Sequence, residues 1–139
     1  MNYVVTNKQS LFLLLTSHIT LLTSSYGYIT SNNTSLKIKS IIHSGIYFTS
    51  VNYWHNPRYN TWQRKLDIIY TNIAILYSII YAQYTKCFAL YNQMMLITGI
   101  IYIMNLYIYH NTKYKWISVV LHGCVHLISN YASYRLYIC

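Results

Sequence analysis

Two histidines four residues apart are the sharpest chemical feature of this sequence. His122 and His126 stand in the segment LHGCVHL. If this segment is helical, the two imidazoles share one face and lie about 6 Å apart. Imidazoles at that spacing can bind one Zn²⁺ when further ligands come from elsewhere in the chain. The pair is also typical of hydrogen-bonded histidines inside a helical bundle, and the sequence leaves both interpretations open.

Asp67 is the only acidic residue of the 139, because the chain contains no Glu. It follows Arg64 and Lys65 and opens a predicted helix. A carboxylate at a helix start, or one paired with Arg64, is stabilised by about 0.3–1 kcal/mol. Alternatively, the carboxylate points into a helical bundle, where an acid at membrane depth usually marks a functional site.

The composition identifies the environment in which these groups act. Only 8% of the residues are charged and 55% are hydrophobic, whereas a soluble domain carries about 25% charged residues. This argues against a soluble globular domain, and the 18 tyrosines argue against a disordered chain. The net charge is +9, but the cations are spread over every predicted connection, so nucleic-acid binding is not expected. We expect them to bind the head groups of anionic membrane lipids, at about 1 kcal/mol each.

Five uncharged windows are long enough for the roughly 17–25 residues of helix that cross a bilayer. The windows span residues 9–36, 40–57, 68–85, 87–112 and 116–134. The predicted fold is therefore all-α, a polytopic membrane helical bundle forming one domain over residues 1–139. Its helices are expected near residues 11–28, 38–54, 67–84, 88–109 and 116–137. The first also resembles a signal peptide, but no convincing cleavage site follows it, so we expect a retained helix. Gly99 and Gly123 are expected to permit close approach of neighbouring helices.

The distribution of cations predicts the orientation of this bundle. Five crossings put six cations on the side of the N-terminus: Lys8, Arg58, Arg64, Lys65, Lys113 and Lys115. The other side receives four: Lys37, Lys39, Lys86 and Arg135. Since cytoplasmic loops carry the excess of Lys and Arg, the N-terminus is predicted to be cytoplasmic. Two overlapping glycosylation sequons, at Asn32 and Asn33, would then face the lumen.

The spacing of the three cysteines does not indicate a disulfide framework. Cys87, Cys124 and Cys139 are widely separated and odd in number. Cysteines of this kind are more often buried thiols than bridges, so the sequence gives no reason to expect an oxidised scaffold.

The same topology gathers the metal-capable groups in one leaflet. His55, Asp67, His122 and His126 fall in the half of the membrane nearest the N-terminus. His122 and His126 would lie about 9–15 Å in from Trp116. His110 ends its helix on the same side. His43 lies deeper, about 18 Å from His55 along a straight helix.

The order of these residues resembles the alkaline ceramidase and adiponectin-receptor superfamily of membrane hydrolases. The matching positions are Ser50, His55, Leu66-Asp67, His122 and His126. The resemblance implies that His55, His122 and His126 bind zinc, with His43 as an alternative to His55. It also implies that Asp67 orients or deprotonates the zinc-bound water, and that Ser50 assists at the substrate or oxyanion. That family has seven helices, whereas five are predicted here.

Two functions from different classes follow. The first is a zinc-dependent hydrolase of a lipid amide or ester, in which the metal supplies hydroxide near neutral pH. The second is a non-enzymatic structural protein of a viral inner membrane or an organelle, or a peripheral subunit of a larger membrane complex. The abundance of Ile, Tyr, Asn and Lys favours AT-rich codons and thus a viral or organellar source. Membrane lipids and a homo-oligomer or larger assembly are the expected partners.

Overall fold

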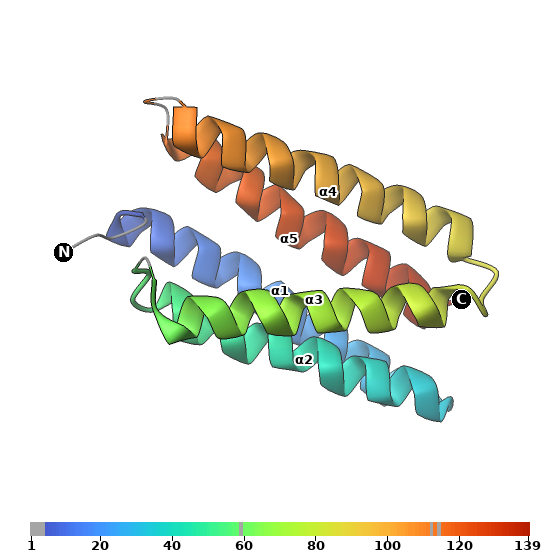
Figure 1. The fold of residues 1–139 in the computed structure, drawn as a ribbon. Helices are drawn as coiled ribbons and strands as arrows, with labels where there is room; N and C mark the ends of the chain where they lie inside the picture. The colour runs from blue at the N-terminus through green and yellow to red at the C-terminus, as the bar shows by residue number, and fades with distance from the viewer. Residues whose placement is uncertain (1–4, 59, 112, 114) are drawn as a thin grey trace.

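The structure, a computed structural model, describes residues 5–58, 60–111, 113 and 115–139. These residues form five helices and no strand. The helices are α1 (Asn7–Thr30), α2 (Thr34–Trp54), α3 (Trp62–Ala82), α4 (Phe88–Asn111) and α5 (Lys115–Tyr137). They run as long rods along a common direction (Figure 1). The prediction of an all-α fold with five helices is thus confirmed.

Polar side chains start the first three helices, because a capping oxygen satisfies backbone N–H groups that have no helical partner. Thr6 and Gln9 form a reciprocal capping box at α1. The Asn33 side chain accepts from the backbone N–H of Ser35 at α2. Thr61 caps α3, which therefore begins five residues before the predicted start. Asp67 consequently lies in the second turn, and its interpretation as a helix-start carboxylate is wrong.

The helices form an open row in space. The order of contact is α3, α2, α1, α5 and α4, with α1 between α2 and α5. Only a few residues of α3 and α4 touch, so the two ends of the row barely meet (Figure 1). The bundle is therefore least closed between α3 and α4.

Glycines let α1 approach α5 closely. A Cβ atom on Gly123 would lie 2.6 Å from the ring of Phe12, and one on Gly27 would lie 2.5 Å from the ring of Tyr137. The prediction for Gly123 is confirmed. The prediction for Gly99 is wrong, because a Cβ atom there would meet nothing within 4 Å.

The side chains are distributed in the reverse of a soluble protein. On α1 the exposed side chains include Leu15 (60% exposed), Leu22 (69%) and Ile29 (79%). The buried face of the same helix is mostly small and polar, and it comprises Ser10, Leu13, Thr16, Ser17, Thr20, Ser24 and Gly27. Small residues inside and large apolar residues outside are typical of helices that pack in a membrane.

Two helices, α3 and α4, are long and apolar enough to cross a membrane. In each, only 17% of the most apolar 18-residue window is buried. A core helix of a soluble protein would be mostly buried, so these two helices do not fit that alternative.

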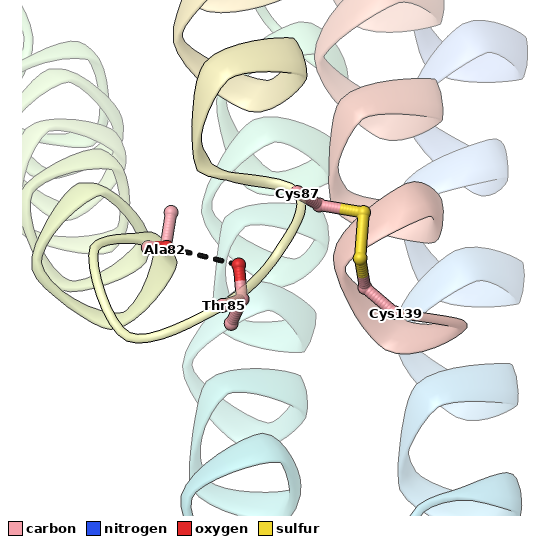
Figure 2. The surroundings of a disulfide bond; sticks show 4 residues. All are labelled: Ala82, Thr85, Cys87 and Cys139. Carbon is pink, nitrogen blue, oxygen red and sulfur yellow. Dashed lines mark hydrogen bonds between the residues drawn. A yellow bond between two sulfur atoms is a disulfide. The ribbon is translucent and has the colours of Figure 1, made fainter.

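A disulfide joins the connection between α3 and α4 to the last residue of the chain (Figure 2). Cys87 and Cys139 have Cα atoms 6.1 Å apart, which is a normal separation for such a bond. Cys124 remains a free thiol. The expectation that all three cysteines are thiols is therefore wrong. The antiparallel packing of α4 and α5 brings the two cysteines together, and their sequence spacing does not reveal it.

Candidate functional site

A cavity of about 110 Å³ lies where α1, α3 and α5 begin and α2 and α4 end. Its polar and charged lining consists of Arg64, Asp67, Asn105, His110, Ser118 and His122. Its aromatic lining consists of Tyr53, Trp54, Tyr102 and Tyr109. This is the end of the bundle at which the sequence predicts the functional groups.

Asp67 reaches this cavity from the second turn of α3. Its Oδ1 atom accepts hydrogen bonds from the hydroxyls of Thr49, at 2.9 Å, and Ser50, at 2.8 Å. Hydrogen bonds to a charged group each contribute about 1.5–3 kcal/mol, which offsets part of the cost of burying a carboxylate. Ser50, which the family resemblance places at the substrate or oxyanion, thus donates its hydroxyl proton to the carboxylate of Asp67. Thr49, which the sequence analysis missed, does the same.

His122 reaches the cavity from α5, where Asn105 of α4 holds its ring. The Nδ2 atom of Asn105 lies 3.3 Å from Nδ1 of His122. The Oδ1 atom of Asn105 accepts from the hydroxyl of Ser118, which fixes the amide orientation. Since an amide nitrogen only donates, Nδ1 of His122 is the acceptor and the ring proton lies on Nε2. The imidazole lone pair is therefore already engaged.

His126 lies one turn farther along α5 and contacts α1 instead of the cavity. Its Nδ1 atom is 2.9 Å from Oγ1 of Thr16. That hydroxyl donates its proton to the carbonyl of Leu13, so its oxygen accepts from His126. The rings of His122 and His126 have centroids 4.9 Å apart. The two histidines share a face, as predicted, but bond to different helices.

Three of the four remaining histidines lie at three different places. His110 lines the cavity. His55 is exposed at the end of α2 and lines a separate hollow with Asn7 and Pro57. His43 is buried farther along α2, with Nδ1 3.3 Å from the hydroxyl of Tyr137 near the end of α5.

The predicted zinc ligands do not form one donor set. Among the residues that the structure describes, no three His, Cys, Asp or Glu side chains gather as a metal site. The lone pair of His122 is used by Asn105, and His55 and His43 lie at other places. The arrangement does not fit a three-ligand site, so we derive no chemical step through a metal. Zinc stays a prediction from the sequence.

Comparison with known protein families, curated proteins and solved structures finds no match to this chain. The resemblance to the ceramidase superfamily therefore stays a hypothesis, and the function is argued from the cavity and its surroundings.

Sequence reasoning missed Asn105, Ser118 and the aromatic lining of the cavity. A signal for Asn105 was present, since it is a polar residue within the apolar run of α4. Polar side chains at membrane depth usually mark a site. The aromatic residues carried no such signal, because tyrosines occur throughout the chain.

Proposed function

We propose that this chain is a multi-pass integral membrane protein in which all five helices cross the bilayer, and that the cavity beside Asp67 is its functional site. The observation that carries the proposal is the reversed distribution of side chains. Large apolar residues cover the outside, while sixteen polar or charged side chains are buried among the described residues. An apolar surface of this kind is unfavourable in water and favourable in lipid. Helices suit a lipid environment because their backbone groups form hydrogen bonds within the helix.

The polar composition of α1, α2 and α5 is compatible with this proposal. On α5, for example, Ser118, Asn130 and Ser133 are buried. The face that these helices offer to lipid is therefore more apolar than their average composition. All five helices have 21–24 residues, a length of about 31–36 Å. A hydrocarbon core of about 30 Å is thus spanned by each.

The disulfide supports the crossing of α5. If α4 crosses the membrane, its start near Cys87 and its end at Asn111 lie on opposite sides. Cys139 is bonded to Cys87, so the chain after Asn111 must return across the membrane. The helix that makes this return is α5.

The same bond supports a cytoplasmic N-terminus, because disulfides persist in oxidising compartments and not in the cytosol. Cys87 and Cys139 lie at the end opposite the N-terminus. Cations agree with this orientation. At the N-terminal end Lys8, Lys65, Lys113 and Lys115 are exposed. At the other end only Lys86 is exposed among the described residues, while Lys37 and Arg135 are half-buried and Lys39 is fully buried over the ring of Tyr137.

A carbene reagent dissolved in the lipid phase tests whether α1 faces lipid. We expect Leu15 and Leu22 to be modified when the protein is reconstituted in vesicles and its peptides are analysed by mass spectrometry. Leu13 is the matched control, because it is equally apolar but only 1% exposed. Modification confined to α3 and α4 would reduce the proposal to two crossings.

A membrane hydrolase acting on a lipid amide or ester is the second candidate. One observation favours it: Asp67, with Ser50 bonded to it, lines the same cavity as His122. Of the zinc ligands predicted from the sequence, only His122 lines this cavity, so the candidate rests on Asp67, Ser50 and His122. Metal content of the purified protein is the measurement that separates a zinc hydrolase from a non-enzymatic membrane protein.

A further inference from the structure

Four ring side chains that line the cavity contact one another in series, and we call them the aromatic wall: Tyr53, Trp54, His122 and Tyr102. The rings of Tyr53 and Trp54 have centroids 4.6 Å apart, and Trp54 and His122 are 5.2 Å apart. Tyr102 continues the wall, with its centroid 6.4 Å from that of His122. The negative faces of aromatic rings attract cations, and groups of aromatic side chains are used to recognise quaternary ammonium groups.

The only acid of the chain lies in the same lining. Both hydrogen bonds to Asp67 reach Oδ1, and within the described part of the chain none reaches Oδ2. One carboxylate oxygen therefore remains for a ligand. In a protein of net charge +9, this oxygen and the aromatic wall are the features that favour a cation.

Arg64 adds a positive charge to the lining, one turn before Asp67 on α3. A guanidinium matches the geometry of a phosphate group and is always charged. His110 and His122 also line the cavity, and His122 accepts from Asn105 as a neutral ring. One acid and one permanent cation in a single small cavity are complementary to a zwitterion.

Size and position restrict the ligand further. A volume of about 110 Å³ is far below the 300–1,000 Å³ of a site for a drug-sized molecule. It is also below the roughly 150 Å³ of a cavity that holds benzene, so the cavity itself admits a group about as small as trimethylammonium. The lining includes Ile68 of α3 and Leu106 of α4, the two helices that barely touch. Exposed Trp62 and Trp116 mark this end of the bundle as the membrane interface.

We propose that the cavity binds the quaternary ammonium of a phosphocholine head group on a phospholipid, with Asp67 and the aromatic wall on the ammonium and Arg64 on the phosphate. The acyl chains lie in the bilayer beside the opening between α3 and α4. This assignment rests on the proposed membrane function, because the chains need lipid at that place.

Fluorescence of Trp54 tests the assignment. The chain has three tryptophans, so Trp62→Phe together with Trp116→Phe leaves Trp54 as the sole reporter. Full-length protein in a sugar-based detergent is titrated with short-chain phosphatidylcholine, phosphatidylethanolamine and phosphatidylglycerol of equal chain length. We expect a saturable change with phosphatidylcholine, at a concentration at least tenfold lower than with the other two lipids.

Substitutions test the contacts to the ammonium and to the phosphate separately. Asp67→Asn is expected to weaken phosphatidylcholine binding at least tenfold. Arg64→Gln should weaken phosphatidylcholine and phosphocholine while leaving choline chloride unchanged. Lys65→Gln, which removes an exposed charge next to Arg64, is the matched control and should change nothing. Tyr102→Leu alters a partly exposed wall residue and should reduce the preference for choline over ethanolamine lipid, even if Asp67→Asn folds poorly.

Three outcomes would overturn the assignment. Equal affinity for phosphatidylglycerol would remove the ammonium site, and so would unchanged binding in both Asp67→Asn and Tyr102→Leu. Free phosphocholine binding as tightly as the lipid would make a soluble molecule the ligand. If carbene labelling of Leu15 and Leu22 holds while choline selectivity fails, the membrane proposal stands and only the ligand is lost.

Discussion

Asp67 could be singled out from the sequence, but its structural environment could not be predicted from it. As the chain's single acid it could be selected from composition alone. Its partners could not, because they are hydroxyls on α2 rather than the neighbouring Arg64 and Lys65. The error about its place in α3 has a simple origin. Thr61 provides a cap that starts the helix five residues before the predicted start at residue 67.

For the histidine pair, too, the sequence predicts one feature and misses another. The spacing of four residues correctly predicts that His122 and His126 share a face, and their rings are 4.9 Å apart. The partners of the two rings, Asn105 on α4 and Thr16 on α1, depend on the packing of three helices. Spacing within one helix carries no information about that packing.

The hydrogen bonds of these histidines lead to a prediction at the residue scale. We expect His122→Ala and His126→Ala each to lower the free energy of unfolding by about 1–3 kcal/mol, because each leaves a buried partner without its bond. Thermal unfolding in detergent, with and without added zinc, measures the loss. About one zinc per purified chain, lost in both variants, would contradict this account and support the hydrolase.

At the scale of the helices, averaged hydropathy hides how α1, α2 and α5 differ from α3 and α4. Five polar residues of α1 are buried and lower the average without meeting the surroundings: Ser10, Thr16, Ser17, Thr20 and Ser24. His18 and Ser25 on the same helix are exposed. Uncharged windows identified all five helices because they ignore this polarity. The disulfide was not predicted, because it depends on helix packing and not on the pattern within one segment. Cys87 and Cys139 are 52 residues apart, and only the pairing of α4 with α5 brings them together.

Close packing of α1 against α5 gives a prediction at this scale. Gly27→Ala is expected to destabilise the bundle by about 1–3 kcal/mol, as an overpacked core does. The new Cβ atom would press on the ring of Tyr137, which is buried and bonded to His43. Gly99→Ala is the matched control, since its Cβ atom meets nothing, and it should leave stability unchanged or raise it by up to about 1 kcal/mol. Equal unfolding midpoints for both variants would argue against this contact.

The whole molecule has two chemically different ends. Four exposed lysines and the cavity lie at the end of the N-terminus. The disulfide, the sequons and the inward-turned Lys39 lie at the other. Counting cations predicted the direction of this asymmetry. The burial of Lys39 could not be predicted by counting, because it depends on packing against the ring of Tyr137.

The sidedness of Asn32 relative to Lys8 tests the five-helix membrane bundle most directly, because Lys8 lies in the first turn of α1, Asn32 follows its end, and both are exposed. Lys8→Cys and Asn32→Cys, each in a Cys124→Ala background, are treated in sealed vesicles with a membrane-impermeant maleimide before and after permeabilisation. The account predicts that the two positions react from opposite sides, with Asn32→Cys on the side of the disulfide. Reaction of both from the same side would mean that α1 does not cross the membrane, and would contradict the account.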